Sequence, residues 1–146
     1  TAQGLGEVLG ELGLSSFVKT SGRKGLHVVI PLERVYRFEE TRSFVHALGI
    51  LLSRRLPGVV SELSGTHVAG TVFVDYLQNA AWKTMIGPYS LRATAEATVS
   101  MPLAWEELRE GLVPEDFTIH TAISRTGDPW KGFFDRAERL PKVNHD

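Results

Sequence analysis

The chain contains no cysteine among its 146 residues. Disulfide frameworks and thiolate metal sites are therefore excluded, and a reducing, cytoplasmic environment fits this composition. Neither sign of charge is in excess, because 16 basic and 17 acidic residues leave a formal net charge of −1. Binding to a polyanion would therefore have to come from a local basic patch and not from the overall charge.

Long apolar segments are missing as well. The central run from Ala47 to Leu52 is too short to cross a bilayer. The first residues include Glu7 and Glu11 and no basic cluster, which is unlike a signal peptide. We therefore expect a cytoplasmic domain, or a piece of one, that has no membrane partner. Its length and its 42% hydrophobic residues suffice for one compact core.

Helical periodicity is clear in two segments. Apolar residues at positions 5, 8, 9 and 12 share one helical face, and Gly13 can end that helix. The stronger helix runs from Glu39 to Leu56, with acidic residues in its first turn and arginines in its last. A short helix is expected after Pro102, and a last helix should turn Phe133, Phe134 and Ala137 inward.

Strand patterns lie between these helices. Residues 16–19 and 26–32 predict a strand, a turn and a second strand, and 71–77 predict a buried strand that ends at Asp75. Residues 61–70 are polar and predict a loop, whereas 88–101 alternate well enough for one or two more strands. Because the order is not strictly βαβ, we expect an α+β fold, with a mixed or antiparallel sheet flanked by helices.

The stretch VKTSGRKGLHVVIPL, residues 18–32, is the first candidate site. Its two glycines allow backbone N–H groups to converge on an anion. Ser21 adds a hydroxyl, Lys24 a mobile positive charge, and His27 a further donor. The alternative is an ordinary hairpin turn that is solvated by Arg23 and Lys24.

Three other residues could contribute to a site. Asp75 follows the apolar residues VFV, where it could hold a ligand or simply begin a turn. Gln78, with its neighbour Asn79, could contact that ligand or cap the turn. Arg92 could bind phosphate or pair with a carboxylate on a sheet surface. No zinc site is expected, since the histidines lack ligand spacing, and no G-x-S-x-G elbow indicates a serine hydrolase.

The order and spacing of several motifs together resemble one family. FVKTSGRKGLHVVIPL, VFVDYLQN, GPYSLRA and SMPLAWEEL resemble the polymerase domain of bacterial non-homologous end-joining DNA ligase D, of the archaeo-eukaryotic primase superfamily. The resemblance covers residues 5–142. It implies a nucleotidyltransferase that extends DNA ends with nucleotides, often ribonucleotides, using manganese or magnesium.

The resemblance also implies a role for each matched residue. Ser21 and His27, with Lys24 between them, would hold the triphosphate of the incoming nucleotide, and Arg92 would contact it too. Asp75 would be a catalytic ligand of the divalent cation, with Gln78 close to the nucleotide. The implied partners are nucleoside triphosphates, broken DNA ends, the Ku protein, and ligase and nuclease domains. The implied location is the nucleoid of a bacterial or archaeal cytoplasm.

One motif of the family is missing from residues 1–146. The family places an Asp-x-Asp pair upstream of the serine-histidine turn, whereas no two aspartates here are separated by a single residue. We therefore expect the chain to correspond to the C-terminal half of such a domain and to be inactive alone. It should then pair with a separate N-terminal half, self-associate, or expose an apolar patch. The alternatives are a non-catalytic nucleotide- or nucleic-acid-binding module, or a purely structural domain.

Overall fold

A computed structural model describes residues 1–62 and 68–141 of the chain. These residues form two compact units. The first, unit 1, comprises the described residues of Thr1–Gly13 and Leu32–Thr84 together with residues 139–141. The second, unit 2, comprises Leu14–Pro31 and Met85–Glu138. Residues 63–67 of the predicted 61–70 loop lie outside the described residues.

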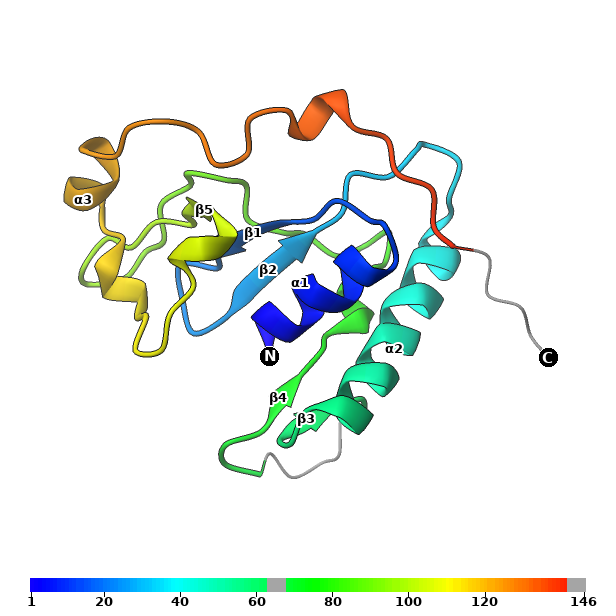
Figure 1. Cartoon of the computed structure of the whole chain (residues 1–146). Coiled ribbons are helices and arrows are strands. Elements are labelled where there is room, and N and C mark those ends of the chain that lie inside the picture. The colour runs from blue at the N-terminus through cyan, green and yellow to red at the C-terminus, as the bar shows by residue number, and fades with distance from the viewer. Residues whose placement is uncertain (63–67, 142–146) are drawn as a thin grey trace. The chain divides into compact units, whose positions relative to one another are not determined.

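Unit 1 contains the two longest helices and a small parallel sheet. Its elements are α1 (Ala2–Glu11), α2 (Phe38–Arg55), β3 (Val59–Val60) and β4 (Val72–Phe73), and Val59 of β3 pairs with Val72 of β4. Both predicted helices are confirmed. Leu48 and Leu52 of α2 are buried, and β3 packs beside the helix that it follows, as Figure 1 shows. Gly13, with a φ of 71°, lies just beyond the end of α1.

Unit 2 is built on an antiparallel sheet with the order β2-β1-β5. The predicted strand-turn-strand is confirmed as β1 (Phe17–Thr20) and β2 (Leu26–Val29), which pair directly across the 21–25 turn. The third strand, β5 (Pro102–Leu103), pairs with the other edge of β1. Val18, Met101 and Leu103 are buried at this edge, and Trp130 donates a hydrogen bond to the Val18 carbonyl at 2.8 Å.

Hydroxyl side chains replace part of the regular strand pairing next to β1. Thr20 Oγ1 donates to the Val99 carbonyl at 3.0 Å and accepts from Met101 N–H at 2.8 Å. Ser100 Oγ donates to the Thr20 carbonyl at 2.8 Å, and Thr98 Oγ1 donates to the Gly22 carbonyl at 2.6 Å. The segment 98–101 is therefore joined to β1 and to the 21–25 turn by buried polar side chains.

Several predicted elements are wrong in extent or type. The strand predicted for 71–77 is only β4, and its Val72 is 47% exposed and not buried. Residues 88–101 form a hairpin with isolated bridges, such as Leu91 to Val99, because its hydroxyl side chains bond to backbone groups. Pro102 belongs to β5, so the helix predicted after it shrinks to a 3₁₀ turn, Trp105–Glu107.

The predicted last helix is also wrong. Only a 3₁₀ turn, Phe133–Asp135, forms there, and Phe134 is 95% exposed. Phe133 instead packs on Trp130 and Phe17, with ring centroids 5.1 Å from each. These aromatic contacts stabilise the segment without helical periodicity. A short helix that the sequence did not indicate, α3 (Ile119–Ile123), follows Thr118, whose side chain caps it by accepting from Thr121 N–H.

The predicted α+β class is confirmed, since helices, antiparallel strands and a parallel strand pair all occur in the chain. Within the described residues, no helix is both long and apolar enough to span a membrane.

Candidate functional site

The 21–25 turn is closed around the hydroxyl of Ser21. Ser21 Oγ accepts hydrogen bonds from the N–H groups of Arg23 and Gly25, both at 3.1 Å, and Ser21 N–H donates to the Gly25 carbonyl at 2.8 Å. Two N–H groups that could have converged on an anion therefore converge on a side chain of the protein. The Ser21 hydroxyl hydrogen remains as a donor for a ligand, because both oxygen lone pairs are occupied.

Gly22 brings Arg92 against this turn. Its φ is 72°, and a Cβ at this position would lie 2.7 Å from Arg92 Cγ. Arg92 Nε donates to the Ser21 carbonyl at 2.9 Å, although the two residues are 71 positions apart. No other hydrogen bond or ion pair of this guanidinium occurs within the described residues. Its two terminal amino groups can therefore still receive a phosphate.

His27 lies on β2 directly opposite Lys19 of β1. Lys19 Nζ is 2.9 Å from His27 Nδ1 and donates a 2.6 Å hydrogen bond to Ser100 Oγ. The Lys19 side chain is fully buried. The pair therefore places one imidazole nitrogen against a buried amine, whereas His27 Nε2 has no hydrogen-bond partner within the described part of the chain.

Burial determines the protonation of this pair. Burial, followed by the charge of Arg92, lowers the pKa of Lys19 from 10.5 to about 8. Burial, followed by the charges of Lys19 and Arg92, lowers the pKa of His27 from 6.5 to about 4. At neutral pH, Lys19 therefore remains protonated while His27 is neutral.

Lys24 occupies the tip of the turn. Its side chain is exposed, and among the described residues it has no hydrogen bond or ion pair. The neighbouring Arg23 is exposed in the same way. Unit 2 therefore contains Ser21, Lys24, His27 and Arg92, and hydrogen bonds and charge couple Arg92 to Ser21 and His27.

Asp75 and Gln78 belong to unit 1. Asp75 precedes a 3₁₀ turn, Tyr76–Gln78, but its exposed side chain makes no capping hydrogen bond. The carboxylate has no hydrogen-bond or ion-pair partner in the described residues, and it is therefore free to bind a cation. Gln78 Nε2 donates to the Thr84 carbonyl at 2.7 Å, and it thereby closes the loop that follows.

A cation at Asp75 would need further ligands. The described residues contain no group of three His, Asp or Glu side chains that could hold a metal ion. A carboxylate is an oxygen ligand of the kind that manganese and magnesium accept, but Asp75 alone among the described residues would leave most coordination positions of such an ion to other groups.

Sequence reasoning missed Lys19 and Ser100. A lysine in the strand FVKT, opposite a histidine in LHVV, is the signal that could have found Lys19, because paired residues point to the same sheet face. Ser100 reaches Lys19 across 81 positions, and its local sequence carries no comparable signal.

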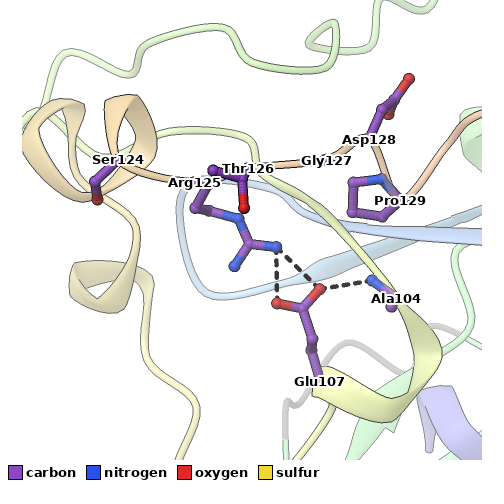
Figure 2. A pocket seen from close by; sticks show the side chains of 8 residues that line it. All are labelled: Ala104, Glu107, Ser124, Arg125, Thr126, Gly127, Asp128 and Pro129. Atoms are coloured by element: carbon purple, nitrogen blue, oxygen red, sulfur yellow. Dashed lines mark hydrogen bonds and ion pairs between the residues drawn. The ribbon is translucent and has the colours of Figure 1, made fainter.

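A separate hollow in unit 2 contains none of the predicted residues. Its lining, shown in Figure 2, consists of Ala104, Glu107 and residues 124–129. Arg125 Nη2 contacts the Glu107 carboxylate at 2.7 and 2.9 Å, and this carboxylate also accepts from Ala104 N–H at 2.7 Å. The Glu107 carboxylate thus offsets the charge of Arg125 in this hollow, which makes it a weaker anion site than the surroundings of Arg92.

A family model described as "LigD, primase-polymerase domain" matches residues 1–130. The chain belongs to the LigD primase-polymerase domain family. It is 34% identical to the multifunctional non-homologous end joining protein LigD of Pseudomonas aeruginosa over 139 residues, which cover 91% of the chain. It is 36% identical to the bifunctional LigD of Bacillus subtilis over 138 residues, or 92% of the chain. The resemblance noted in the sequence is therefore confirmed.

The fold agrees with this family. The polymerase domain of Mycobacterium tuberculosis ligase D, solved in complex with DNA, matches with a TM-score of 0.75 and 32% identity. The match covers 94% of this chain and 49% of that domain. The chain spans 16% of the Pseudomonas LigD and 22% of the Bacillus LigD, so it corresponds to part of one module of these proteins.

Proposed function

We propose that this chain is the nucleotide- and metal-binding portion of a primase-type polymerase, which transfers nucleotides to a 3′-hydroxyl in end-joining repair of double-strand breaks. One observation carries most of the proposal. In a member of the LigD primase-polymerase family, the 21–25 turn brings Arg92 to Ser21, and His27 is held beside the same turn as a neutral donor.

The triphosphate would be bound by donors of different kinds. Arg92 offers two terminal amino groups, the Ser21 hydroxyl offers its hydrogen, and His27 offers Nε2–H. Lys24, exposed at the tip of the turn, adds a mobile charge that can follow a phosphate oxygen. Charge-assisted bonds from Arg92 and Lys24 would provide most of the affinity, and the neutral donors would orient the phosphates.

Asp75 is proposed as a ligand of manganese or magnesium, and Gln78 as a residue close to the nucleotide. In nucleotidyl transfer, the metal ions activate the attacking hydroxyl and stabilise the leaving pyrophosphate. Two such ions require more carboxylates than Asp75, and residues 1–146 contain no Asp-x-Asp pair. We therefore propose that the 146-residue chain by itself does not add nucleotides. Robust manganese-dependent primer extension by this polypeptide would contradict that statement.

The proposed macromolecular partners follow from the relatives. The Mycobacterium domain was solved with DNA, and the curated relatives are end-joining proteins. We propose that this chain acts on DNA ends and, within a larger assembly, beside Ku and the ligase and nuclease domains. We also propose that this chain pairs with a separate polypeptide that carries the Asp-x-Asp motif, or with a second copy of itself.

Titration of fluorescent ATP tests the nucleotide-binding proposal. Lys24→Ala should weaken binding by about tenfold, because it removes a charge-assisted contact. Arg23→Ala is the matched control, since it removes an equally exposed positive charge from the same turn. Equal losses in both variants would indicate only nonspecific attraction, and unchanged affinity in both would overturn the proposed role of the turn.

A second candidate is a non-catalytic nucleotide-binding module that retains the fold. The observation that favours it is the absence of an Asp-x-Asp pair in residues 1–146. Adding a polypeptide that carries the N-terminal half of a related domain discriminates the two. Restored primer extension supports the enzyme portion, whereas ATP binding without extension supports the module.

A further inference from the structure

The ammonium group of Lys19 is buried without a carboxylate partner. Its side chain is 0% exposed, and no ion pair to it occurs within the described residues. Buried charges in proteins are normally paired, because removing an ion from water is strongly unfavourable. The contacts of Nζ are instead Ser100 Oγ at 2.6 Å and His27 Nδ1 at 2.9 Å.

The strand register explains how this contact forms. Lys19 and His27 are direct partners in the antiparallel β1–β2 pair, so both side chains stand on the same face of the sheet. Ser100 completes the arrangement from the other side, because its hydroxyl accepts from Lys19 and donates to the Thr20 carbonyl at 2.8 Å.

The contact determines which imidazole nitrogen carries hydrogen. An ammonium group has donors and no acceptor, so His27 Nδ1 must accept from Lys19. A neutral imidazole with an accepting Nδ1 carries its hydrogen on Nε2. His27 Nε2 has no partner in the described residues, which leaves this N–H available to a ligand.

We propose that Lys19 is the positioning residue of His27, holding the imidazole as the Nε2–H tautomer so that it donates to a phosphate oxygen of the nucleotide. This inference rests on the proposed triphosphate site, but the effect on the tautomer can be measured without any ligand. Lys19 itself is fully buried, so it acts on the ligand only through its contact with His27.

Protonation of Lys19 near neutral pH supports this role. The pKa of Lys19 is about 8, and that of His27 is about 4, so the pair holds a single proton charge across the intervening range. Arg92 is the other charged group that acts on both residues. Above pH 8, a neutral Lys19 can also accept a hydrogen bond, and the tautomer is then no longer imposed.

Nitrogen-15 NMR of labelled histidine in the intact chain tests the tautomer. In wild type at pH 7, the Nδ1 signal of His27 should be that of an unprotonated nitrogen and the Nε2 signal that of an N–H. Lys19→Met keeps the apolar length of the side chain and removes the donor. It should give a mixture of tautomers and a raised His27 pKa, whereas Lys19→Arg should retain the wild-type pattern. An unchanged tautomer in Lys19→Met would overturn the proposal.

ATP titration of the same proteins separates the effect of Lys19 on the His27 tautomer from its effect on nucleotide binding. Lys19→Met should lower ATP affinity about tenfold, and Lys19→Arg should restore most of it. A changed tautomer with unchanged ATP affinity would refute the role in binding. If wild type binds no ATP, the triphosphate proposal fails, and the part of the inference that concerns binding fails with it, while NMR still decides whether Lys19 orients His27.

The wild-type chain provides a measurement that needs no variant. Between pH 7 and pH 9.5, the His27 signals should shift from the pure Nε2–H form toward a tautomer mixture as Lys19 loses its proton. Signals that remain constant over this range would contradict the proposal even if the Lys19 variants do not fold.

Discussion

Ser21 accepts two hydrogen bonds within its own turn, and its carbonyl accepts a third from Arg92, whereas Asp75 is exposed and has no partner in the described residues. The 21–25 turn is thus ordered by the protein before any ligand arrives. In the segment after β4, by contrast, no hydrogen bond or ion pair within the described residues holds the Asp75 carboxylate, so a bound cation could orient it. A preformed site reduces the entropy lost on binding nucleotide, while a free carboxylate avoids competition with the metal.

The largest expected effect concerns the carboxylate. In the presence of a polypeptide that carries the N-terminal half of a related domain, Asp75→Asn should abolish the binding of Mn²⁺ at micromolar metal, because an amide oxygen is a much weaker ligand than a carboxylate. Electron paramagnetic resonance of free Mn²⁺ measures this loss. Asp135→Asn is the control, since Asp135 is also an exposed aspartate. Equal Mn²⁺ binding by wild type and Asp75→Asn would show that Asp75 is not a ligand of the metal.

A methyl group on Gly22 should disrupt the ordered turn. Gly22→Ala would be strained at a φ of 72° and would place Cβ 2.7 Å from Arg92 Cγ and 3.3 Å from Ser100 N. We expect the free energy of unfolding to fall by about 3 kcal/mol. Gly111→Ala has a similar φ of 78° with nothing within 4 Å, so it isolates the backbone strain at about 1 kcal/mol. Urea unfolding measures both, and equal losses would show that the turn tolerates the added methyl group.

The buried Lys19 should make stability depend on pH. Its pKa is lowered from 10.5 to about 8, so between these values the unfolded chain binds more protons than the folded chain. The free energy of unfolding should therefore rise with pH across this window, by at most about 3 kcal/mol from this group. Below pH 8 the folded state bears the full cost of the buried charge.

Urea unfolding at pH 8 and pH 10 isolates this contribution. The rise should be smaller in Lys19→Met than in wild type, because the shifted group is gone. Lys24→Met serves as the matched control, since it removes an exposed lysine of the neighbouring turn. A pH response of Lys19→Met identical to that of Lys24→Met would indicate that Lys19 titrates normally in the folded chain.

The smallest expected effects are changes in the free energy of unfolding on substitution of Ser21 in the ordered turn and of Asp75 after β4. Ser21→Ala leaves the N–H groups of Arg23 and Gly25 without their acceptor and should cost about 2 kcal/mol of unfolding free energy. Asp75→Asn breaks no hydrogen bond or ion pair in the described residues and should change stability by less than about 0.5 kcal/mol. Thermal denaturation of the two variants gives the comparison, and a larger loss in Asp75→Asn would reverse it.

The long helix and the hairpin could be predicted because their signals are local. Glu39, Glu40, Arg54 and Arg55 lie at the ends of α2 as their charges indicate. The 21–25 turn joins β1 to β2 as expected. The predictions for residues 88–101 and 133–137 were wrong because the conformation of these segments depends on contacts that are distant in the sequence. Their conformation depends on buried hydroxyl contacts in one case and on aromatic contacts with Phe17 and Trp130 in the other.

For the candidate site too, the residues could be predicted from the sequence, whereas their contacts could not. Ser21, Lys24, His27, Asp75 and Arg92 were recognisable from residue type and motif order, and family membership is confirmed, whereas their roles remain proposals. Residue type alone could not indicate that Ser21 Oγ would accept two N–H groups of its own turn, which leaves only its hydrogen for a ligand.

By itself, the sequence determined the family, the two main helices, the hairpin and the identity of the candidate ligands, because each depends on neighbouring residues or on motif order. Tertiary structure alone decided that Arg92 would bond to the Ser21 carbonyl and that Lys19 would bond to Ser100 and His27. Contacts across 71 and 81 positions arise only when the sheet forms, and burial in that sheet lowers the pKa values of Lys19 and His27.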